Sequence, residues 1–240
     1  MILGRHISFG GPITFFVVMA LFLVIHLFSP SPAHAGEAGD QVSGILRGLQ
    51  ERYAGLPGLS MPYERDIMTK SMALLGEDMR QDLATGRIFF KPPHFFRLQQ
   101  ETPRPETVIS DGRTVWWYIP QEKTAYKYPS QKLGQELKLL SDIFKGLKNV
   151  REGFKVILDD PEMKGEHRIK LIPNPPWPDI DHIMISVEEK DFVIKSVAIY
   201  NLIGGRTRFV FGNLLVEEGF EEQFFEFDVP EGVRVIEEKT

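Results

Sequence analysis

Residues 108–120 read VISDGRTVWWYIP, and this stretch decides the class of fold. Val108-Ile109 and Val115-Trp116 lie on either side of Asp111-Gly112. β-Branched and aromatic residues favour strands, and glycine tolerates the positive φ that a two-residue hairpin turn requires. The segment therefore predicts two antiparallel strands, with Trp116 and Tyr118 on one face and Trp117 on the other, because neighbours in a strand point to opposite faces.

Short runs of the same kind continue on both sides of this hairpin, each bounded by Pro, Gly or Asp. Runs separated by turn signals favour an antiparallel meander. We predict strands at residues 80–91, 94–101, 106–110, 113–119, 124–128, 154–158, 167–172, 180–187, 192–200, 206–211, 224–227 and 233–236. So many strands predict one large sheet, which must twist and curl and so acquire a concave face.

Two segments have a helical rather than a strand period. Residues 36–53 carry apolar side chains at spacings of three and four, and residues 133–147 do so at Leu133, Leu137, Leu140 and Phe144. Each pattern predicts a helix with one apolar stripe. Helices of this kind are the expected covers for the concave face of the sheet.

The N-terminus has the layout of a secretory signal peptide. Arg5 precedes the apolar run Ile13–Phe28, and Ala33-His34-Ala35 follows two prolines. The alternative is a retained membrane anchor, but the run has 16 residues, and a spanning helix needs ~20. We expect residues 1–35 to be removed after Ala35 during export to the periplasm, leaving residues 36–240 as one domain.

Composition excludes several classes of protein. The formal net charge is −5 and basic residues do not cluster, which argues against nucleic-acid binding. The chain has no cysteine, so it has no disulfide, no thiol nucleophile and no cysteine metal site. Bacterial lipidation also needs a cysteine, so the chain is not expected to be a lipoprotein itself.

Motifs for catalysis are missing. The three histidines beyond the signal segment, His94, His167 and His182, are isolated, and the sequence has neither a G-x-S-x-G elbow nor a phosphate-binding loop. Pairs of acidic residues lie at strand ends, where a solvated surface is the ordinary interpretation. We expect no catalytic residue, no metal and no cofactor.

After these exclusions, apolar and aromatic side chains are the remaining candidates for a functional surface. For any single aromatic residue, ordinary core is the simpler interpretation. Taken together, however, few helices are available to cover a large sheet. Part of the concave face is therefore expected to stay free for an apolar ligand.

Two segments resemble the outer-membrane lipoprotein carrier (LolA) family: Lys91–Leu98, KPPHFFRL, and residues 108–120. Gly204–Thr207 and the Phe225–Val235 pattern are similar to the family's late hairpin and closing strands. The resemblance implies a mainly β fold with an α lid: an unclosed antiparallel β-barrel, or half-barrel, covered by two or three helices around an apolar cavity. It also implies a monomeric carrier, which takes lipoproteins from an inner-membrane ABC-type complex to an outer-membrane receptor.

The sequence departs from the family at two positions. Pro92 stands where the family has an arginine that holds the lid, and Leu98 stands where it has a tryptophan. Arg97 matches the family's later arginine, and Lys91 is adjacent to Pro92 but should face the other way. Arg97 and Lys91 are our candidates for lid and transfer control.

Alternation and the resemblance together give the expected acyl-chain site. The lining residues are Phe89, Phe96, Leu98, Ile109, Trp116 and Tyr118, with Leu140 and Phe144 on the lid. A register shift of one residue would exchange each lining residue for its neighbour. On this assignment, Phe96→Glu should impair cargo uptake or release and leave the protein folded.

Three other functions fit parts of the pattern. A carrier or sensor of a phospholipid or glycolipid would use the same apolar cavity. A lipid-acting periplasmic hydrolase would need a nucleophile with a nearby base, and no such pair is evident in the sequence. A structural adaptor would have a filled interior.

Overall fold

A computed structural model describes residues 33–75, 83–129, 139, 141–221 and 223–237. The chain divides into two units, residues 1–39 and 40–240. Of the first unit only residues 33–39 are described, as the start of helix α2. The expected signal peptide thus lies almost wholly outside the described residues, and its cleavage stays a prediction.

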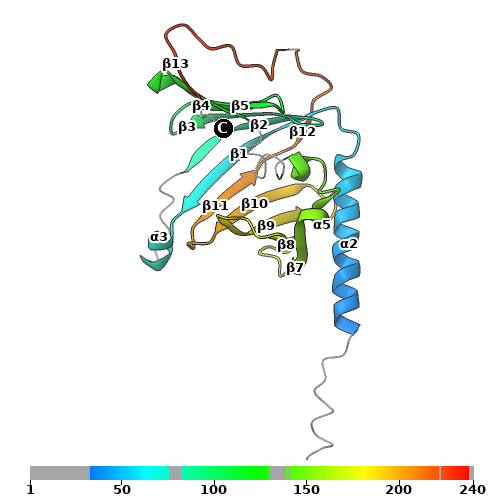
Figure 1. The fold of residues 1–240 in the computed structure, drawn as a ribbon. Coiled ribbons are helices and arrows are strands. Elements are labelled where there is room, and N and C mark those ends of the chain that lie inside the picture. The colour runs from blue at the N-terminus through cyan, green and yellow to red at the C-terminus, as the bar shows by residue number, and fades with distance from the viewer. Residues whose placement is uncertain (1–32, 76–82, 130–138, 140, 222, 238–240) are drawn as a thin grey trace, which may run out of the picture. The chain divides into compact units, whose positions relative to one another are not determined.

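Strands β1 to β13 form one sheet in the second unit (Figure 1). The strands are β1 (Leu59–Met68), β2 (Ala84–Lys91), β3 (Phe95–Thr102), β4 (Glu106–Ser110), β5 (Thr114–Ile119), β6 (Thr124–Pro129), β7 (Phe154–Asp159), β8 (Glu166–Pro173), β9 (Ile180–Glu188), β10 (Ile194–Asn201), β11 (Arg206–Phe211), β12 (Leu215–Val216) and β13 (Arg234–Glu237).

The strand order is β13-β6-β5-β4-β3-β2-β1-β11-β10-β9-β8-β7, and β12 pairs with one end of β1. Neighbours run antiparallel except β13 and β6, which are parallel. The two edge strands, β13 and β7, are not paired with each other in the described part of the chain. The sheet is therefore unclosed, as predicted for a half-barrel.

Few helices accompany the sheet. They are α2 (Ala33–Tyr53), α3 (Lys70–Leu75), α5 (Val150–Gly153) and the 3-10 turn η2 (Pro120–Glu122). Of the predicted helix 133–147, residues 133–138 and 140 lie outside the described residues, whereas 139 and 141–144 are helical. None of the described helices is long and apolar enough to cross a bilayer.

The predicted strands are confirmed except the one at residues 224–227, and the sequence did not predict β1 or the two-residue strand β12. Strand β1 lies at the centre of the sheet. Residues 224–227 are a turn followed by irregular chain. The strand prediction there is wrong because Phe224 and Phe225 pack against other aromatic rings instead of pairing in the ladder.

One face of the sheet, the inner face, carries the core. Alternate residues of β1, β2 and β7–β11 on this face are buried together with apolar residues of α2 and of the described segments 139 and 141–150. The apolar stripe of α2 lies entirely in this cluster, as its period predicted: Val42, Ile45, Leu46, Leu49 and Tyr53. Burial of each such side chain contributes about 1.5–3 kcal/mol, so α2 is a major part of the core.

The 108–120 segment forms the predicted hairpin, β4–β5, with a longer turn than expected. Ser110 pairs with Val115, so four residues lie between the last paired positions instead of two. The Asp111 carboxylate accepts hydrogen bonds from the backbone N–H groups of Arg113 (2.8 Å) and Thr114 (2.7 Å). This carboxylate closes the turn in place of a second ladder bond.

Gly112→Ala is expected to lower the free energy of unfolding by ~1–3 kcal/mol. Gly112 has φ +86°, and an added Cβ would clash with the ring of His94. Urea denaturation followed by circular dichroism measures the change. Gly153→Ala is the matched control, since a Cβ there meets nothing within 4 Å; equal midpoints for the two variants would contradict the expectation.

Candidate functional site

The inner face continues from the core across β3–β6, where its side chains are only half-buried. Cross-strand partners share a face, and the register joins Leu98 to Val108, Val108 to Trp117, and Trp117 to Tyr126. These four residues, which we call the aromatic wall, are each half-buried. The wall thus offers apolar surface that the described core does not fully cover.

The aromatic wall is held in place by its own contacts. Trp117 and Tyr126 stack with ring centroids 5.1 Å apart, and Tyr126 stacks on Tyr128. The indole N–H of Trp117 donates to Glu106 Oε2 at 3.0 Å. An aromatic side chain whose polar atom already has a partner presents a fixed apolar surface to a ligand.

Phenylalanine rings connect the aromatic wall to the core. Phe96 pairs with Phe90 across β2 and β3, and both are buried, at 5% and 1% exposed. Phe144 packs on Phe90 and Phe211, with centroids 5.7 and 6.0 Å apart. Phe96 and Phe144 therefore lie on the side of the sheet that the helices cover, but inside the packed core, so their role as cavity-lining residues stays a prediction.

Helix α2 is firmly attached to the core. The Tyr53 hydroxyl accepts a hydrogen bond from the backbone N–H of Ile194 at 3.2 Å, and burial raises the pKa of Tyr53 to about 12. A Cβ on Gly146 would lie 2.5 Å from the Leu49 carbonyl oxygen, so residues 139–147 approach α2 closely. Lifting α2 would expose its whole apolar stripe at a cost of roughly 10 kcal/mol, so we expect α2 to be a fixed wall.

The predicted lining residues do not share one face. Phe96 and Leu98 lie on the inner face. The other four described residues lie on the opposite, outer face: Phe89, Ile109, Trp116 and Tyr118. Phe89 and Ile109 both pair with Arg97, which follows the inner-face residue Phe96. Trp116 pairs with Ile109, and Tyr118 lies two residues beyond Trp116. The pairing register therefore corrects the prediction that these four residues line the cavity. Leu140 lies outside the described residues.

The C-terminal segment, residues 219–221 and 223–228, covers that outer face. Phe220 and Phe224 pack on Phe89, with centroids 6.4 and 5.0 Å apart. Phe227 packs on Trp116 and Tyr118, at 5.1 and 5.2 Å. In Figure 1 the orange-to-red chain passes over β3–β5, and β13 then joins the sheet edge at β6. These outer-face aromatics therefore belong to structural packing.

Arg97 and Lys91 also contact outer-face groups. Arg97 Nη1 donates to the Phe224 carbonyl oxygen at 2.6 Å, its guanidinium lies 4.8 Å from the Phe224 ring centroid, and burial lowers its pKa. Lys91 lies over the ring of Phe95 at 5.7 Å. Arg97 thus fixes the C-terminal segment, and neither contact joins a described helix that covers the inner face.

A pocket of about 520 Å³ opens where α2 ends. Tyr53, Ala54, Leu56 and Pro92 contribute apolar atoms, and Lys145 and Lys148 contribute charge. The Ser141 hydroxyl donates to the Pro93 carbonyl oxygen at 3.0 Å, which ties residues 139–147 to the β2–β3 connection beside this pocket. Among the described residues no group of three His, Asp or Glu side chains is arranged to hold a metal.

Comparison with known proteins supplies the family. The sequence model of the family described as "Outer membrane lipoprotein carrier protein LolA" matches residues 73–228. The chain belongs to the LolA family. An outer-membrane lipoprotein carrier protein of Pseudomonas paraeruginosa is 24% identical over 227 residues, covering 92% of this chain and 99% of that protein. One of Azotobacter vinelandii is 26% identical over 226 residues, covering 92% of this chain and all of that protein.

A solved structure agrees with the LolA-family fold. The crystal structure of an uncharacterized conserved protein from Thermus thermophilus matches with a TM-score of 0.53 and 8% identity, over 82% of this chain and 99% of that one. At this identity the likeness concerns the fold alone.

Sequence reasoning missed the residues that form most of the aromatic wall. Val108 and Trp117 alternate with residues that were chosen instead, so a correct register would have found them, whereas no residue of β6 was proposed and Tyr126 was missed altogether. It also missed β1, whose Leu59, Met61 and Tyr63 alternate with more polar neighbours. That alternation was the available signal, and Pro62 obscured it.

Proposed function

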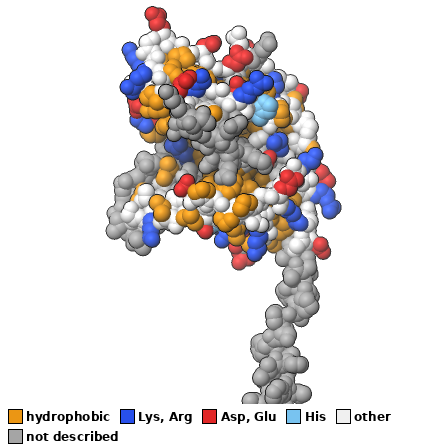
Figure 2. All heavy atoms as spheres, in the orientation of Figure 1, with side chains coloured by type: hydrophobic (Ala, Val, Ile, Leu, Met, Phe, Trp, Pro, Cys, Tyr) orange, Lys and Arg blue, Asp and Glu red, His pale blue; other side chains and the backbone are white. Residues whose placement is uncertain are grey.

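We propose that this protein is a periplasmic carrier that binds the acyl chains of lipoproteins released from the inner membrane and delivers them to an outer-membrane receptor. The observation that carries the proposal is the half-buried aromatic wall on the inner face. The description of its family is that of a carrier, which supports a non-enzymatic role. In Figure 2 hydrophobic side chains lie among charged ones on the face shown.

The physical reason for such a carrier is the cost of wetting a hydrocarbon chain. Moving one methylene from water to an apolar site is favourable by ~0.8 kcal/mol of free energy, so exposing a chain of about sixteen carbons to water costs roughly 12 kcal/mol. A protein surface of aromatic and aliphatic side chains removes most of that cost. A hollow that is only partly enclosed also allows the chain to leave again.

The proposed partners follow from this route. Cargo would come from an inner-membrane ABC-type lipoprotein-releasing complex and pass to an outer-membrane lipoprotein receptor. Depletion of the protein in its own cells is the direct test: lipoproteins should accumulate at the inner membrane. Unchanged lipoprotein localisation after complete depletion would contradict the proposal.

Val108→Glu is expected to weaken binding of a synthetic triacylated lipopeptide by about tenfold or more, because a carboxylate on the aromatic wall must lose its water when an acyl chain contacts it. Val108 is half-buried and lies between Leu98 and Trp117. Displacement of the neutral dye N-phenyl-1-naphthylamine measures the affinity.

Val210→Glu is the matched control for this substitution. Val210 pairs with Glu64 and Ser196 on the outer face and is 38% exposed. It should bind the lipopeptide as the unchanged protein does. Equal loss in both variants would mean that the effect is one of overall charge and not of the aromatic wall.

A further inference from the structure

An unpaired hydroxyl lies on the inner face of β1. Tyr63 is 2% exposed, and its hydroxyl has no hydrogen-bond partner among the described residues. Its ring packs on Phe209, with centroids 5.7 Å apart. Burial raises the pKa of Tyr63 to about 12, so the phenol stays protonated and keeps its proton as a donor at neutral pH.

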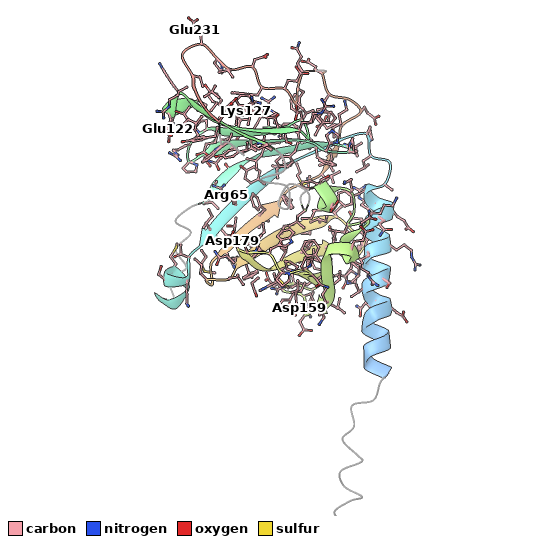
Figure 3. All side chains as sticks on the ribbon, in the orientation of Figure 1. Arg65, Glu122, Lys127, Asp159, Asp179 and Glu231 are labelled. Atoms are coloured by element: carbon pink, nitrogen blue, oxygen red, sulfur yellow. The ribbon has the colours of Figure 1, made fainter. Side chains whose placement is uncertain are left out.

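An arginine follows two residues later on the same face. Arg65 is half-buried, its Nε is buried without an acceptor, and the described part of the chain offers its guanidinium no hydrogen bond or ion pair. Figure 3 labels Arg65 on β1, between the β2–β6 part of the sheet and β9–β11. A guanidinium half-buried among apolar groups is costly unless something accepts its protons.

The acid with the larger electrostatic effect on Tyr63 is already engaged. Glu106 acts electrostatically on Tyr63 and raises its pKa, but its carboxylate accepts from Arg104 at 3.0 Å and from the Trp117 indole at 3.0 Å. An arginine on the outer face differs from Arg65 in having an acidic partner. There Arg206 forms an ion pair with Asp66 at 2.6 Å.

Small residues lie opposite the pair on β2. In the register with β2, Tyr63 lies opposite Gly86 and Arg65 lies opposite Ala84. Toward β11 the partners are Phe211 and Phe209, which are apolar. Two donors that lack a partner among the described residues thus lie two residues apart on β1, on the same face of the sheet as the aromatic wall.

We propose that Tyr63 and Arg65 bind the oxygen atoms at the polar end of an acylated ligand, an ester or amide carbonyl or a phosphate, while the aromatic wall binds the hydrocarbon. This inference rests on the proposed carrier function. Charge-assisted hydrogen bonds from a guanidinium to such oxygens are among the stronger polar contacts in proteins. A few placed polar groups in an apolar site are what orients a ligand.

The test compares probes with and without these oxygens. Purified protein is titrated with N-phenyl-1-naphthylamine, which has no oxygen, and the dye is then displaced by a triacylated lipopeptide or by phosphatidylglycerol. Arg65→Met should weaken binding of the oxygen-bearing lipids about tenfold, with dye affinity unchanged. Tyr63→Phe should also weaken lipid binding and should not lower Tm, because it removes a hydroxyl that has no partner among the described residues.

Arg87→Met is the matched control, since Arg87 lies on the outer face of the adjacent strand β2, opposite Pro62. It should change no affinity. Loss confined to phosphatidylglycerol would identify the bound oxygens as phosphate, and loss for both lipids would identify carbonyls. Unchanged lipid affinity in both Arg65→Met and Tyr63→Phe, or an equal loss of dye binding, would overturn the inference. Failure of the unchanged protein to bind lipopeptide would instead count against the carrier function.

Discussion

Phe96→Glu is expected to unfold the protein, not to leave an intact carrier with impaired release. Phe96 is 5% exposed and pairs with Phe90, which is 1% exposed. The substitution removes an aromatic ring from the core and buries a carboxylate there. The expected loss is ~3–5 kcal/mol or more, against a total stability of about 5–15 kcal/mol for an ordinary domain. The sequence-based expectation of a folded variant is revised because it assumed that Phe96 borders an open cavity.

Chemical denaturation with urea measures this loss. Gln99→Glu is the control, because it adds the same charge to β3 on the outer face, where the amide lies 3.0 Å from Arg97 Nε. It should keep the unchanged midpoint. A Phe96→Glu protein with a normal midpoint would show that the Phe96 ring contacts space that water or ligand can occupy.

Phe225→Ala is expected to destabilise the protein by ~3–5 kcal/mol. Phe225 is 4% exposed, and its ring contacts Phe95, Phe220 and Phe224 with centroids 5.6, 5.0 and 5.1 Å apart. Without it, the C-terminal segment loses the ring that connects its other aromatics to β3. The outer-face aromatic rings should then become accessible and bind hydrophobic dye.

Thermal and urea unfolding measure the effect, with Val229→Ala as the control from the same stretch of chain. Val229 is 42% exposed, so its truncation should cost less than ~0.5 kcal/mol. If the two substitutions lower the free energy of unfolding equally, the packing of the C-terminal segment does not stabilise the sheet.

The register explains why the site was only partly predicted. Alternation correctly placed Phe96 with Leu98, and Trp116 with Tyr118. It could not say whether those two sets share a face, because this depends on how β3, β4 and β5 align with one another. In the structure Ile109 pairs with both Arg97 and Trp116, which places the second set under the C-terminal segment.

Strand β1 is a second feature that the local sequence could not predict. A proline in a central strand removes a ladder hydrogen bond and argues against the strand. Pro62 is tolerated because its carbonyl accepts from Gly212, and its nitrogen faces the same side, at the break between β11 and β12. That break is created by a part of the chain that is distant in sequence, so no local pattern reveals it.

Local patterns established most of the strands, that α2 has one buried stripe, and that the chain resembles a family of carriers with an open sheet. These features repeat along the chain with periods of two or 3.6 residues and need no knowledge of distant partners. The packed chain alone decided which aromatics face the helices, that the C-terminal segment covers the others, and that Tyr63 and Arg65 lie together without a partner among the described residues. Each of these depends on the register between strands that are far apart in sequence, and register follows from packing, not from the pattern of one strand.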